Sequence, residues 1–358
     1  MKITLIGFGL FCILATIMPF MATKKWWIRV FDFPHLQLTI LSLVVLVISL
    51  KVFNFNNILE FIVFLLLGIT SLYQLRLILP YTPLSKKQVA TTKNHKKENS
   101  IRVFSANVFQ DNSDFSSFLK VFRNANPDIA VLLETDRWWK EKIQPLKADY
   151  LHTVEYPLDN YYGIILLSKL PLKNTEVKFL VNNNIPSIHA SVQLPNLTWI
   201  KLYCLHPMPP SPSENESSLD RDTELLLVAK NISSQEYPVI VLGDLNDVAW
   251  SHTTRMFQRI SRLLDPRIGR GFFNTFHTKY PLFRWPLDHL FVSNDFQLLE
   301  LKRLKSIGSD HFPIFAELCH NSHTEQNNSP EKASKEDKIE TKDTIREGLK
   351  ENGKSQTL

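Results

Sequence analysis

The sequence contains few cysteines, and those it has are scattered. Cys12, Cys204 and Cys319 form an odd-numbered set without pairwise spacing, whereas disulfide frameworks and cysteine-based zinc sites are built from regularly spaced pairs. The chain has 358 residues, which is long enough to bury a hydrophobic core without disulfides. A small disulfide-stabilised scaffold and a cysteine zinc site are therefore excluded, whereas the redox compartment stays open.

Long apolar runs are confined to the N-terminal part of the chain. Residues 3–22, 36–50 and 58–79 are almost wholly apolar, and about 20 such residues cross the hydrocarbon core of a bilayer as a helix. The first run has no small-x-small cleavage site and two more runs follow, which argues against a cleaved signal peptide. We expect a membrane region over residues 1–82, with helices at about 3–22, 36–52 and 58–79.

The basic residues beside these runs do not fix the orientation. Lys24, Lys25, Arg29 and five lysines within residues 86–97 lie on one side, whereas Lys2 and Lys51 lie on the other. Positive charge marks the cytoplasmic side, which predicts a cytoplasmic bulk domain, but the rule is weak when a large domain follows the last helix. The side of the membrane therefore stays undecided.

The remaining chain divides into three parts by composition. Residues 83–100 form a basic linker, and residues 101–319 form the folded body. Residues 320–358 carry many charges of both signs, few apolar residues and no aromatic ones. Such a segment cannot bury enough surface to offset the entropy that it loses on ordering. We predict a disordered tail there, with at most a nascent helix over residues 336–350.

The body alternates strand-like and helix-like segments. Helices are expected at residues 114–124 and 219–232, since apolar residues at helical spacing in the first of these would bury one face. Strands are expected at residues 101–108, 128–133, 162–168, 189–194, 199–205, 239–243, 273–276, 289–292 and 312–318. We predict an α/β class fold in the form of an α+β four-layer sandwich: two packed, mainly antiparallel β-sheets flanked by helices and preceded by three transmembrane helices.

Polar residues stand where the predicted strands begin or end. This set comprises Asn107, Glu134, His206, Asp244, Asn246, Asp310 and His311. A sheet fixes the geometry of such side chains while leaving them open to a ligand. Carboxylates are hard oxygen ligands for Mg²⁺, amides donate to phosphate oxygens, and histidine serves as a cationic donor or a general base near neutral pH. These residue types together predict phosphate chemistry assisted by a metal ion.

Seven motifs in order resemble the endonuclease/exonuclease/phosphatase superfamily across the whole body. They are RVFSANV (102–108), DIAVLLETD (128–136), YYGIILLSKLPL (161–172), YCLHP (203–207), VIVLGDLND (239–247), PLDHLFVS (286–293) and GSDHFPIFAEL (308–318). The resemblance implies a hydrolase that attacks a phosphoester with water in line, assisted by Mg²⁺ or alternatively Mn²⁺, with no covalent nucleophile. Whether one or two ions act stays open.

The resemblance also assigns residue roles. It implies metal ligands at Glu134, Asn107 and Asp310, and phosphate contacts from Asn107, His206 and Asn246. Catalytic roles fall on His206, Asp244, Asn246, Asp288 and His311, where Asp244 positions or deprotonates the attacking water and Asp288 orients His311. A carboxylate beside an imidazole suits either a general base or a cationic phosphate clamp, and both readings of this pair stay open.

The sequence leaves the substrate open between a lipid-linked phosphate and a nucleic acid. The body lacks the dense basic stretch with which a protein grips a nucleic acid. Phe272, Phe273, Phe276, Phe283 and Trp285 are expected near the rim of the site, where they would suit a lipid-borne phosphate close to a bilayer. Arg221, with acidic neighbours, is interpreted as part of a solvated helix face.

A membrane-anchored bacterial branch of the superfamily has a similar architecture. It includes teicoplanin-resistance proteins that act on an isoprenoid lipid pyrophosphate, and its body faces outward. The resemblance implies a multi-pass protein of a bacterial inner or plasma membrane, whose partners are the lipid bilayer and a phosphorylated substrate. No protein partner is readable from the sequence. The alternatives are a membrane-tethered nuclease and a catalytically silent binding or scaffolding protein on the same fold.

Overall fold

Three apolar helices extend away from the rest of the molecule in the computed structural model, which describes residues 1–93, 96–321 and 331–354. They are α1 (Lys2–Ile17), α3 (His35–Val52) and α4 (Ile58–Ile78), with the short helix α2 (Trp26–Arg29) between the first two. Short 3₁₀ turns lie at Met18–Phe20, Val30–Asp32, Leu79–Tyr81, Lys97–Asn99 and Gln144–Ala148. All three long helices are long and apolar enough to cross a membrane, as the sequence predicts.

The three helices pack through one side and expose apolar residues on the other. Cys12, Val45 and Leu67 are buried between them, whereas Leu14 and Val47 point outward with more than half of their surface exposed. An outward apolar surface is unfavourable in water and favourable in a bilayer, so the pattern suits a membrane-spanning bundle. Asn57 caps α4, because its side chain accepts hydrogen bonds from the backbone N–H groups of Leu59 and Glu60.

The body contains two β-sheets packed face to face, so the predicted fold class is confirmed. The first sheet has the strand order β10 (Phe296–Arg303), β11 (Ile314–His320), β1 (Ser100–Asn107), β2 (Ile129–Leu133), β4 (Ile164–Ser168) and β3 (His152–Tyr156). The second has the order β5 (Leu172–Lys178), β6 (Ser187–Gln193), β7 (Trp199–Leu205), β8 (Val239–Asp244) and β9 (Asp288–Val292). Neighbouring strands run antiparallel except the pairs β1–β2 and β7–β8.

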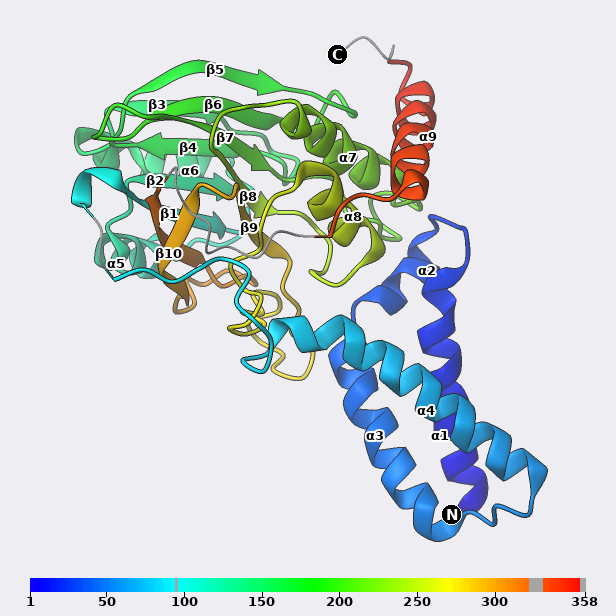
Figure 1. Cartoon of the computed structure of the whole chain (residues 1–358). Coiled ribbons are helices and arrows are strands. Elements are labelled where there is room, and N and C mark those ends of the chain that lie inside the picture. The colour runs from blue at the N-terminus through cyan, green and yellow to red at the C-terminus, as the bar shows by residue number, and fades with distance from the viewer. Residues whose placement is uncertain (94–95, 322–330, 355–358) are drawn as a thin grey trace.

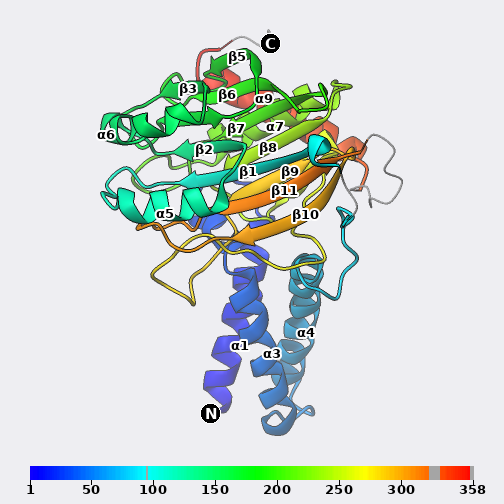
Figure 2. The ribbon, with the colours of Figure 1, turned by 90° about the vertical axis from the view of Figure 1, so that its left-hand side faces the viewer.

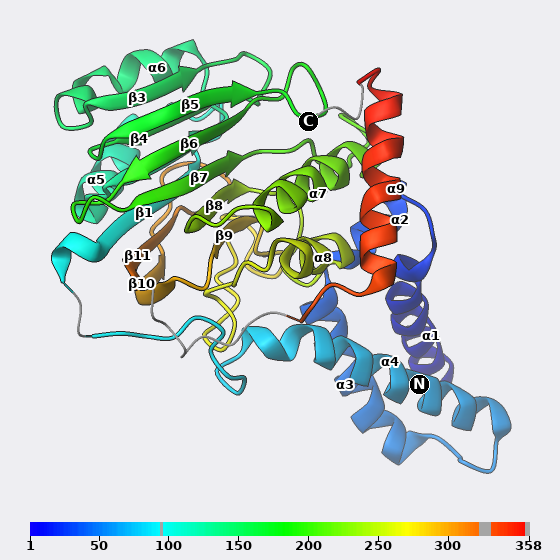
Figure 3. The same cartoon turned by 45° about the horizontal axis from the view of Figure 1, so that its top comes forward.

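Helices cover the outer faces of both sheets (Figures 2 and 3). The first sheet carries α5 (Phe115–Ala125) and α6 (Arg137–Lys142), and the second carries α7 (Leu219–Ser233), α8 (His252–Ser261) and α9 (Lys335–Glu351). Phe118 and Phe122, one helical turn apart, are buried against Phe104 of β1. The apolar residues at helical spacing therefore bury one face of α5, as the sequence predicts. Because α5 and α7 each join two parallel strands, β1 and β2 end at one edge, as do β7 and β8.

Two expectations differ from the structure. Residues 273–276 form no strand, since only Phe276 makes isolated bridges there, to Trp285 and His311. In the tail, the helix expected over residues 336–350 is present as α9, but it is packed against the body and not merely nascent; residues 322–330 and 355–358 of that tail lie outside the described part of the chain. The linker also contacts the body, because Val89 is buried in the core between the sheets and Gln88 accepts a hydrogen bond from the backbone of Asp265.

Helix α9 is fixed by a few well-placed residues. Ser334 and Asp337 form a capping box at its start, and Asp337 also accepts two hydrogen bonds from Arg259 of α8, at 2.9 and 2.6 Å. Ile345 and Leu349 are buried in the cluster formed by α7 and α8. The low apolar content suggested disorder, but the two apolar residues lie four positions apart and therefore on one face.

The three apolar helices and the body share a hydrophobic cluster, which we call the junction. It is formed by the end of α4, the segment before α3 and the loops beside β8 and β9, with Leu77, Ile78, Tyr81, Val248, Ala249, Trp250 and Leu287 buried in it. Two hydrogen bonds cross it: the Tyr81 hydroxyl donates to the carbonyl of Ala249, and the Trp250 indole donates to the carbonyl of Asp32, both at 2.8 Å. The body is therefore packed onto the helices and not only tethered to them.

Loss of the apolar face should release α9. We expect Ile345→Ser with Leu349→Ser to undock the helix, because each buried aliphatic side chain contributes about 2 kcal/mol or more. Limited trypsin digestion of the full chain should then cleave α9 several-fold faster. Ile339→Ser is the matched control, since Ile339 is 62% exposed on the same helix. Equal cleavage rates in the double variant and the control would contradict this account of the docking.

Candidate active site

The predicted site residues come together at the ends of strands from both sheets. Asn107 ends β1 and Glu134 directly follows β2 in the first sheet, whereas Asp244 ends β8 in the second. The Asn107 amide donates to Glu134 Oε1 at 2.7 Å and to Asp244 Oδ2 at 3.2 Å. The side chain of Asn107 thus links a carboxylate beside the first sheet to one at the end of a strand of the second sheet. Asp244 lies 137 positions after Asn107 in the sequence.

His311 lies between two buried carboxylates. Its Nδ1 atom is 2.7 Å from Asp288 Oδ2, and its Nε2 atom is 3.5 Å from Asp244 Oδ2. Asp244 and Asp288 are paired in register between β8 and β9, while His311 comes from the segment before β11 in the other sheet. The predicted contact between Asp288 and His311 is therefore present, and it joins the second sheet to the segment before β11 of the first.

His206 and Asn246 complete the second-sheet side of the site. His206 follows β7 directly, and its Nε2 atom lies 4.0 Å from Asp244 Oδ2. Asn246 donates its backbone N–H to Asp244 Oδ1 at 2.9 Å, while its side-chain amide donates to the carbonyl of Pro207 at 3.0 Å. The amide of Asn246 therefore braces the loop after His206, and its backbone fixes the carboxylate of Asp244.

Asp310 belongs to the same site but makes fewer contacts. Its backbone carbonyl accepts from the N–H of Thr278, and one carboxylate oxygen lies 3.3 Å from the Ser309 hydroxyl. That hydroxyl in turn donates to the carbonyl of Asn107 at 2.8 Å. Ser309, within the GSDHFP motif, thus holds the segment of Asp310 and His311 against the end of β1.

Burial and charge set distinct protonation states across the site. Burial alone would lower the pKa of His311, but Asp288 and Asp244 outweigh it and raise the pKa to about 10. Burial lowers the pKa of His206 to about 4, although Asp244 opposes the change. At neutral pH His311 is therefore an imidazolium and His206 a neutral imidazole. Burial also raises the pKa of Glu134 to about 7, in spite of the hydrogen bond from Asn107.

The backbone at the site adopts strained conformations. Glu134, Asn246 and Phe109 have φ angles of 58°, 51° and 59°, in the left-handed region that non-glycine residues rarely occupy. Gly163 packs closely against the backbone of Thr135, the residue after Glu134. Only glycine permits this approach, because a Cβ atom at position 163 would lie 1.8 Å from the carbonyl oxygen of Thr135. Glu134 and Asn246, two of the predicted site residues, therefore hold backbone conformations that persist only because surrounding contacts stabilise them.

The donor set suits a hard divalent cation. The tight group of possible ligand atoms found in the described residues is Asp244, Asp288 and His311, within 4.8 Å of one another, and it differs from the predicted set of Glu134, Asn107 and Asp310. The His311 imidazolium already neutralises much of that tight group. Glu134, by contrast, is a partly buried carboxylate that accepts hydrogen bonds from the side-chain amide of Asn107 and the backbone N–H of Gln110, and burial raises its pKa. Oxygen donors that lack a counter-charge fit Mg²⁺ or Mn²⁺.

Two residues of the site region escaped the sequence prediction. Arg221 is buried, not solvated: its Nη1 atom donates to the carbonyl of Asn246 at 2.9 Å and lies 3.4 Å from Asp247 Oδ1. The ring of Tyr162 lies 5.3 Å from that of His206, and its hydroxyl contacts Glu214. Asp222, the next residue in the sequence, also pairs with Arg221 at 2.8 Å, but the sequence does not reveal the more distant partners of Arg221, and no local signal marks Tyr162.

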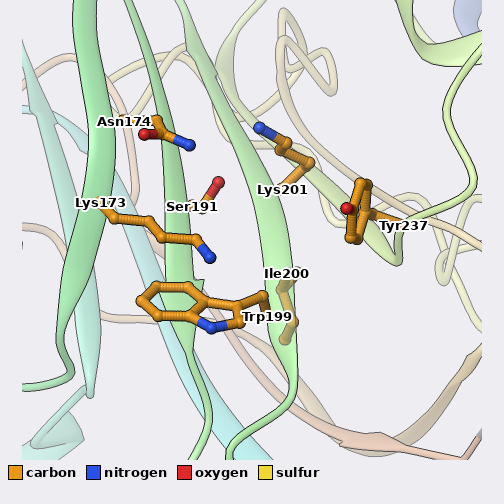
Figure 4. A pocket seen from close by; sticks show the side chains of 7 residues that line it. All are labelled: Lys173, Asn174, Ser191, Trp199, Ile200, Lys201 and Tyr237. Carbon is orange, nitrogen blue, oxygen red and sulfur yellow. The ribbon is translucent and has the colours of Figure 1, made fainter.

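A separate small cavity lies on the open face of β5, β6 and β7 (Figure 4). It has a volume of about 90 Å³ and is lined by Lys173, Asn174, Ser191, Trp199, Ile200, Lys201 and Tyr237. The Lys173 ammonium lies 3.7 Å from the centre of the Trp199 ring, in a cation–π contact. The cavity shares no residue with the candidate site, so it plays no part in the geometry described above.

Comparisons with known proteins agree with this architecture. A family model described as the Endonuclease/Exonuclease/phosphatase family matches residues 104–311. The catalytic domain of human Nocturnin, solved with a bound sulfate anion, is 16% identical over 64% of this chain and 97% of its own, with a TM-score of 0.51. A search of curated protein sequences gives no match.

Two further structures have a TM-score of 0.50. An endonuclease/exonuclease/phosphatase from Beutenbergia cavernae is 17% identical over 62% of this chain and 72% of its own. TDP2 of D. rerio, solved with a single-strand DNA product, is 18% identical over 61% of this chain and 98% of its own. At these identities the similarity shows the fold alone.

His311 should remain protonated well above neutral pH. Its raised pKa means that folding stabilises the charged form, so this contribution to stability is complete below the ordinary value of about 6.5 and is lost as pH rises through about 10. Nuclear magnetic resonance of the labelled imidazole in the full chain measures this directly. We expect Asp288→Asn to lower the pKa of His311, whereas an ordinary titration near pH 6.5 in the unsubstituted protein would refute the assignment.

Proposed function

The chain belongs to the endonuclease/exonuclease/phosphatase family, and from this premise we propose that it is a membrane-anchored, metal-dependent hydrolase that cleaves a phosphoester by in-line attack of water. Members of the family are typically hydrolases that act on phosphoester bonds. The observation that carries the proposal is the convergence of Glu134, Asn107 and Asp244 with the Asp288–His311 pair. A silent scaffold has no physical need for this buried, strained and charged arrangement.

A divalent cation would be held by Glu134 and Asp310, and by the amide oxygen of Asn107 if the side chain turned away from the backbone N–H of Phe109, from which that oxygen accepts a hydrogen bond in this structure. When bound, it supplies positive charge that stabilises the non-bridging and leaving oxygens of the phosphoester. Glu134 would bind it as a carboxylate, because the added charge lowers the pKa that burial has raised. Mg²⁺ is the expected ion, and Mn²⁺ is the alternative.

Asp244 and His311 act on the water and the phosphate. Asp244 has one oxygen fixed by the backbone of Asn246 and the other beside His311, which supports a role for Asp244 in orienting and deprotonating the attacking water. His311 lies between two carboxylates, and an imidazole there balances their charge only when it is protonated. We therefore assign His311 as a cationic phosphate clamp and not as the general base.

His206 and Asn246 are assigned contacts with the phosphoryl oxygens. His206 is neutral at pH 7, so it stabilises developing charge as an N–H donor and not as a cation. Its Nδ1 atom and Asp288 Oδ1 are buried without a hydrogen-bond partner in the described part of the chain, and such atoms are commonly satisfied by water or ligand. The side-chain amide of Asn246 would exchange its bond to Pro207 for one to phosphate.

A lipid-linked phosphate is the proposed substrate, in preference to a nucleic acid. The helices that suit a bilayer are packed directly beside the site, because Leu287 of the junction precedes Asp288 and Val248 follows Asp247. Among the aromatic residues expected at the rim, Phe272 and Trp285 belong to the junction. Phe283 is 59% exposed, and the ring of Phe276 lies 4.9 Å from that of His311. Together they form an apolar path from the helices to the site.

The decisive assay uses the full chain in lipid nanodiscs, because a truncated body would expose the junction. The substrates are an isoprenoid pyrophosphate, a phospholipid, a plasmid and bis(p-nitrophenyl) phosphate, each with Mg²⁺, with Mn²⁺ or with EDTA. We expect turnover of a lipid-linked substrate that EDTA abolishes and Mg²⁺ restores. Cleavage of the plasmid alone would establish the nuclease alternative, and no turnover of any substrate would establish the silent alternative.

Substitutions at the site should remove turnover and leave the fold intact. Asp244→Asn and His311→Ala should each lower kcat at least about 100-fold, since each removes a group that acts on the reacting atoms. Asp149→Asn is the matched control, because Asp149 is an exposed carboxylate outside the site. Thermal unfolding of each variant shows whether the fold is kept. Full activity in either site variant would refute its assigned role.

A further inference from the structure

The coil between α8 and β9 carries an exposed apolar tip beside the membrane helices. Tyr280, Leu282 and Phe283 are 58%, 78% and 59% exposed, and Lys279 and Arg284 flank them. We call residues 279–283 the lip. In Figure 2 the coil that contains it extends below the sheets toward the helices. Three large adjacent side chains of this kind are an unusual surface for a protein to present to water.

The lip has a defined shape. The N–H of Phe283 donates to the carbonyl of Tyr280, and the N–H of His277 donates to the carbonyl of Phe283. Arg284 closes the base of the loop, because its guanidinium donates to the carbonyls of His277 and Thr278 at 3.1 and 2.7 Å. These bonds hold the apolar side chains outward, so their exposure is built into the fold.

One contact fixes the depth of the lip relative to the bilayer. Gln37, in the first turn of α3, donates from its side-chain amide to the carbonyl of Leu282 at 2.8 Å. Since α3 is a candidate membrane span, its first turn lies at the boundary between headgroups and acyl chains. Leu282 therefore lies at that boundary too, where aromatic and aliphatic side chains flanked by Lys and Arg are favoured.

The other end of the same loop touches the active site. The backbone of Thr278 donates to the carbonyl of Asp310 at 2.8 Å, and Phe276 packs on the ring of His311. Leu282 lies four positions after Thr278, and such a segment spans at most about 14 Å. The mouth of the site therefore lies within roughly one headgroup layer of the membrane.

We propose that the lip inserts into the boundary between lipid headgroups and acyl chains and holds the mouth of the active site against the bilayer. For its effect on catalysis this inference rests on the proposed function. The apolar part of a lipid substrate then stays in the bilayer while its phosphate reaches Asp310 and His311. A substrate dissolved in water gains nothing from the lip.

A fluorescent probe tests the insertion without reference to activity. Leu282→Cys in the full chain is labelled with an environment-sensitive nitrobenzoxadiazole dye, which the three buried native cysteines should not take up. In phosphatidylcholine nanodiscs that contain lipids spin-labelled near the headgroup, we expect blue-shifted and strongly quenched emission. Leu151→Cys is the control, since Leu151 is 77% exposed on the loop before β3. Equal emission and quenching at the two positions would overturn the proposal.

A kinetic comparison tests the effect on substrate. Leu282→Ser should raise the apparent KM for a lipid-linked substrate about tenfold, as expected from the loss of apolar burial. The kcat for bis(p-nitrophenyl) phosphate should not change, and Leu151→Ser should affect neither value. An unchanged KM for the lipid would refute the catalytic effect. If no lipid is turned over, the proposed substrate is wrong, while the quenching result still decides whether the lip inserts.

Discussion

The structure depends on one buried charge arrangement, the His311 imidazolium between Asp288 and Asp244. Both carboxylates belong to the second sheet, and the histidine comes from the segment that leads into β11 of the first. An unpaired charge in such a buried place is unfavourable by several kcal/mol, so each member of the group requires the others. Asn107 extends the arrangement to Glu134. The two sheets are therefore held in register at the edge where the polar side chains meet.

Much of this could be predicted from the sequence, because the fold places strand ends together. Asn107, Glu134, His206 and Asp244 each stand at the end of an apolar strand, and strand ends are visible as a change from apolar to polar residues. The position of helix α9 was predicted, over residues 336–350, but its docking was not, since that depends on tertiary contacts of Ile345, Leu349 and Asp337. The burial of Arg221 was missed for the same reason: its partners Asn246 and Asp247 are distant in sequence. The roles of the site residues stay predictions, since geometry alone does not measure turnover.

The junction makes the three apolar helices a packed part of the structure and not only a tether. A tether would need only a flexible linker, yet Tyr81 and Trp250 bond across the junction and Val89 of the linker lies in the core of the body. The loops that enter this contact are the ones that carry Asp247 and Asp288. Tilt of the helices within a bilayer would therefore be transmitted to the site, whereas a flexible linker would absorb it.

Helix α9 packs on α7 and contacts Lys24 in the connection between α1 and α2 through Glu347. A ribosome synthesises α1 long before α9, so the three apolar helices can insert into a bilayer before most of the body has been synthesised. The apolar face of α7, on which Ile345 and Leu349 pack, therefore stays uncovered until α9 has been synthesised. During biosynthesis, this uncovered apolar face of α7 is where a chaperone or a protease would first bind the nascent protein.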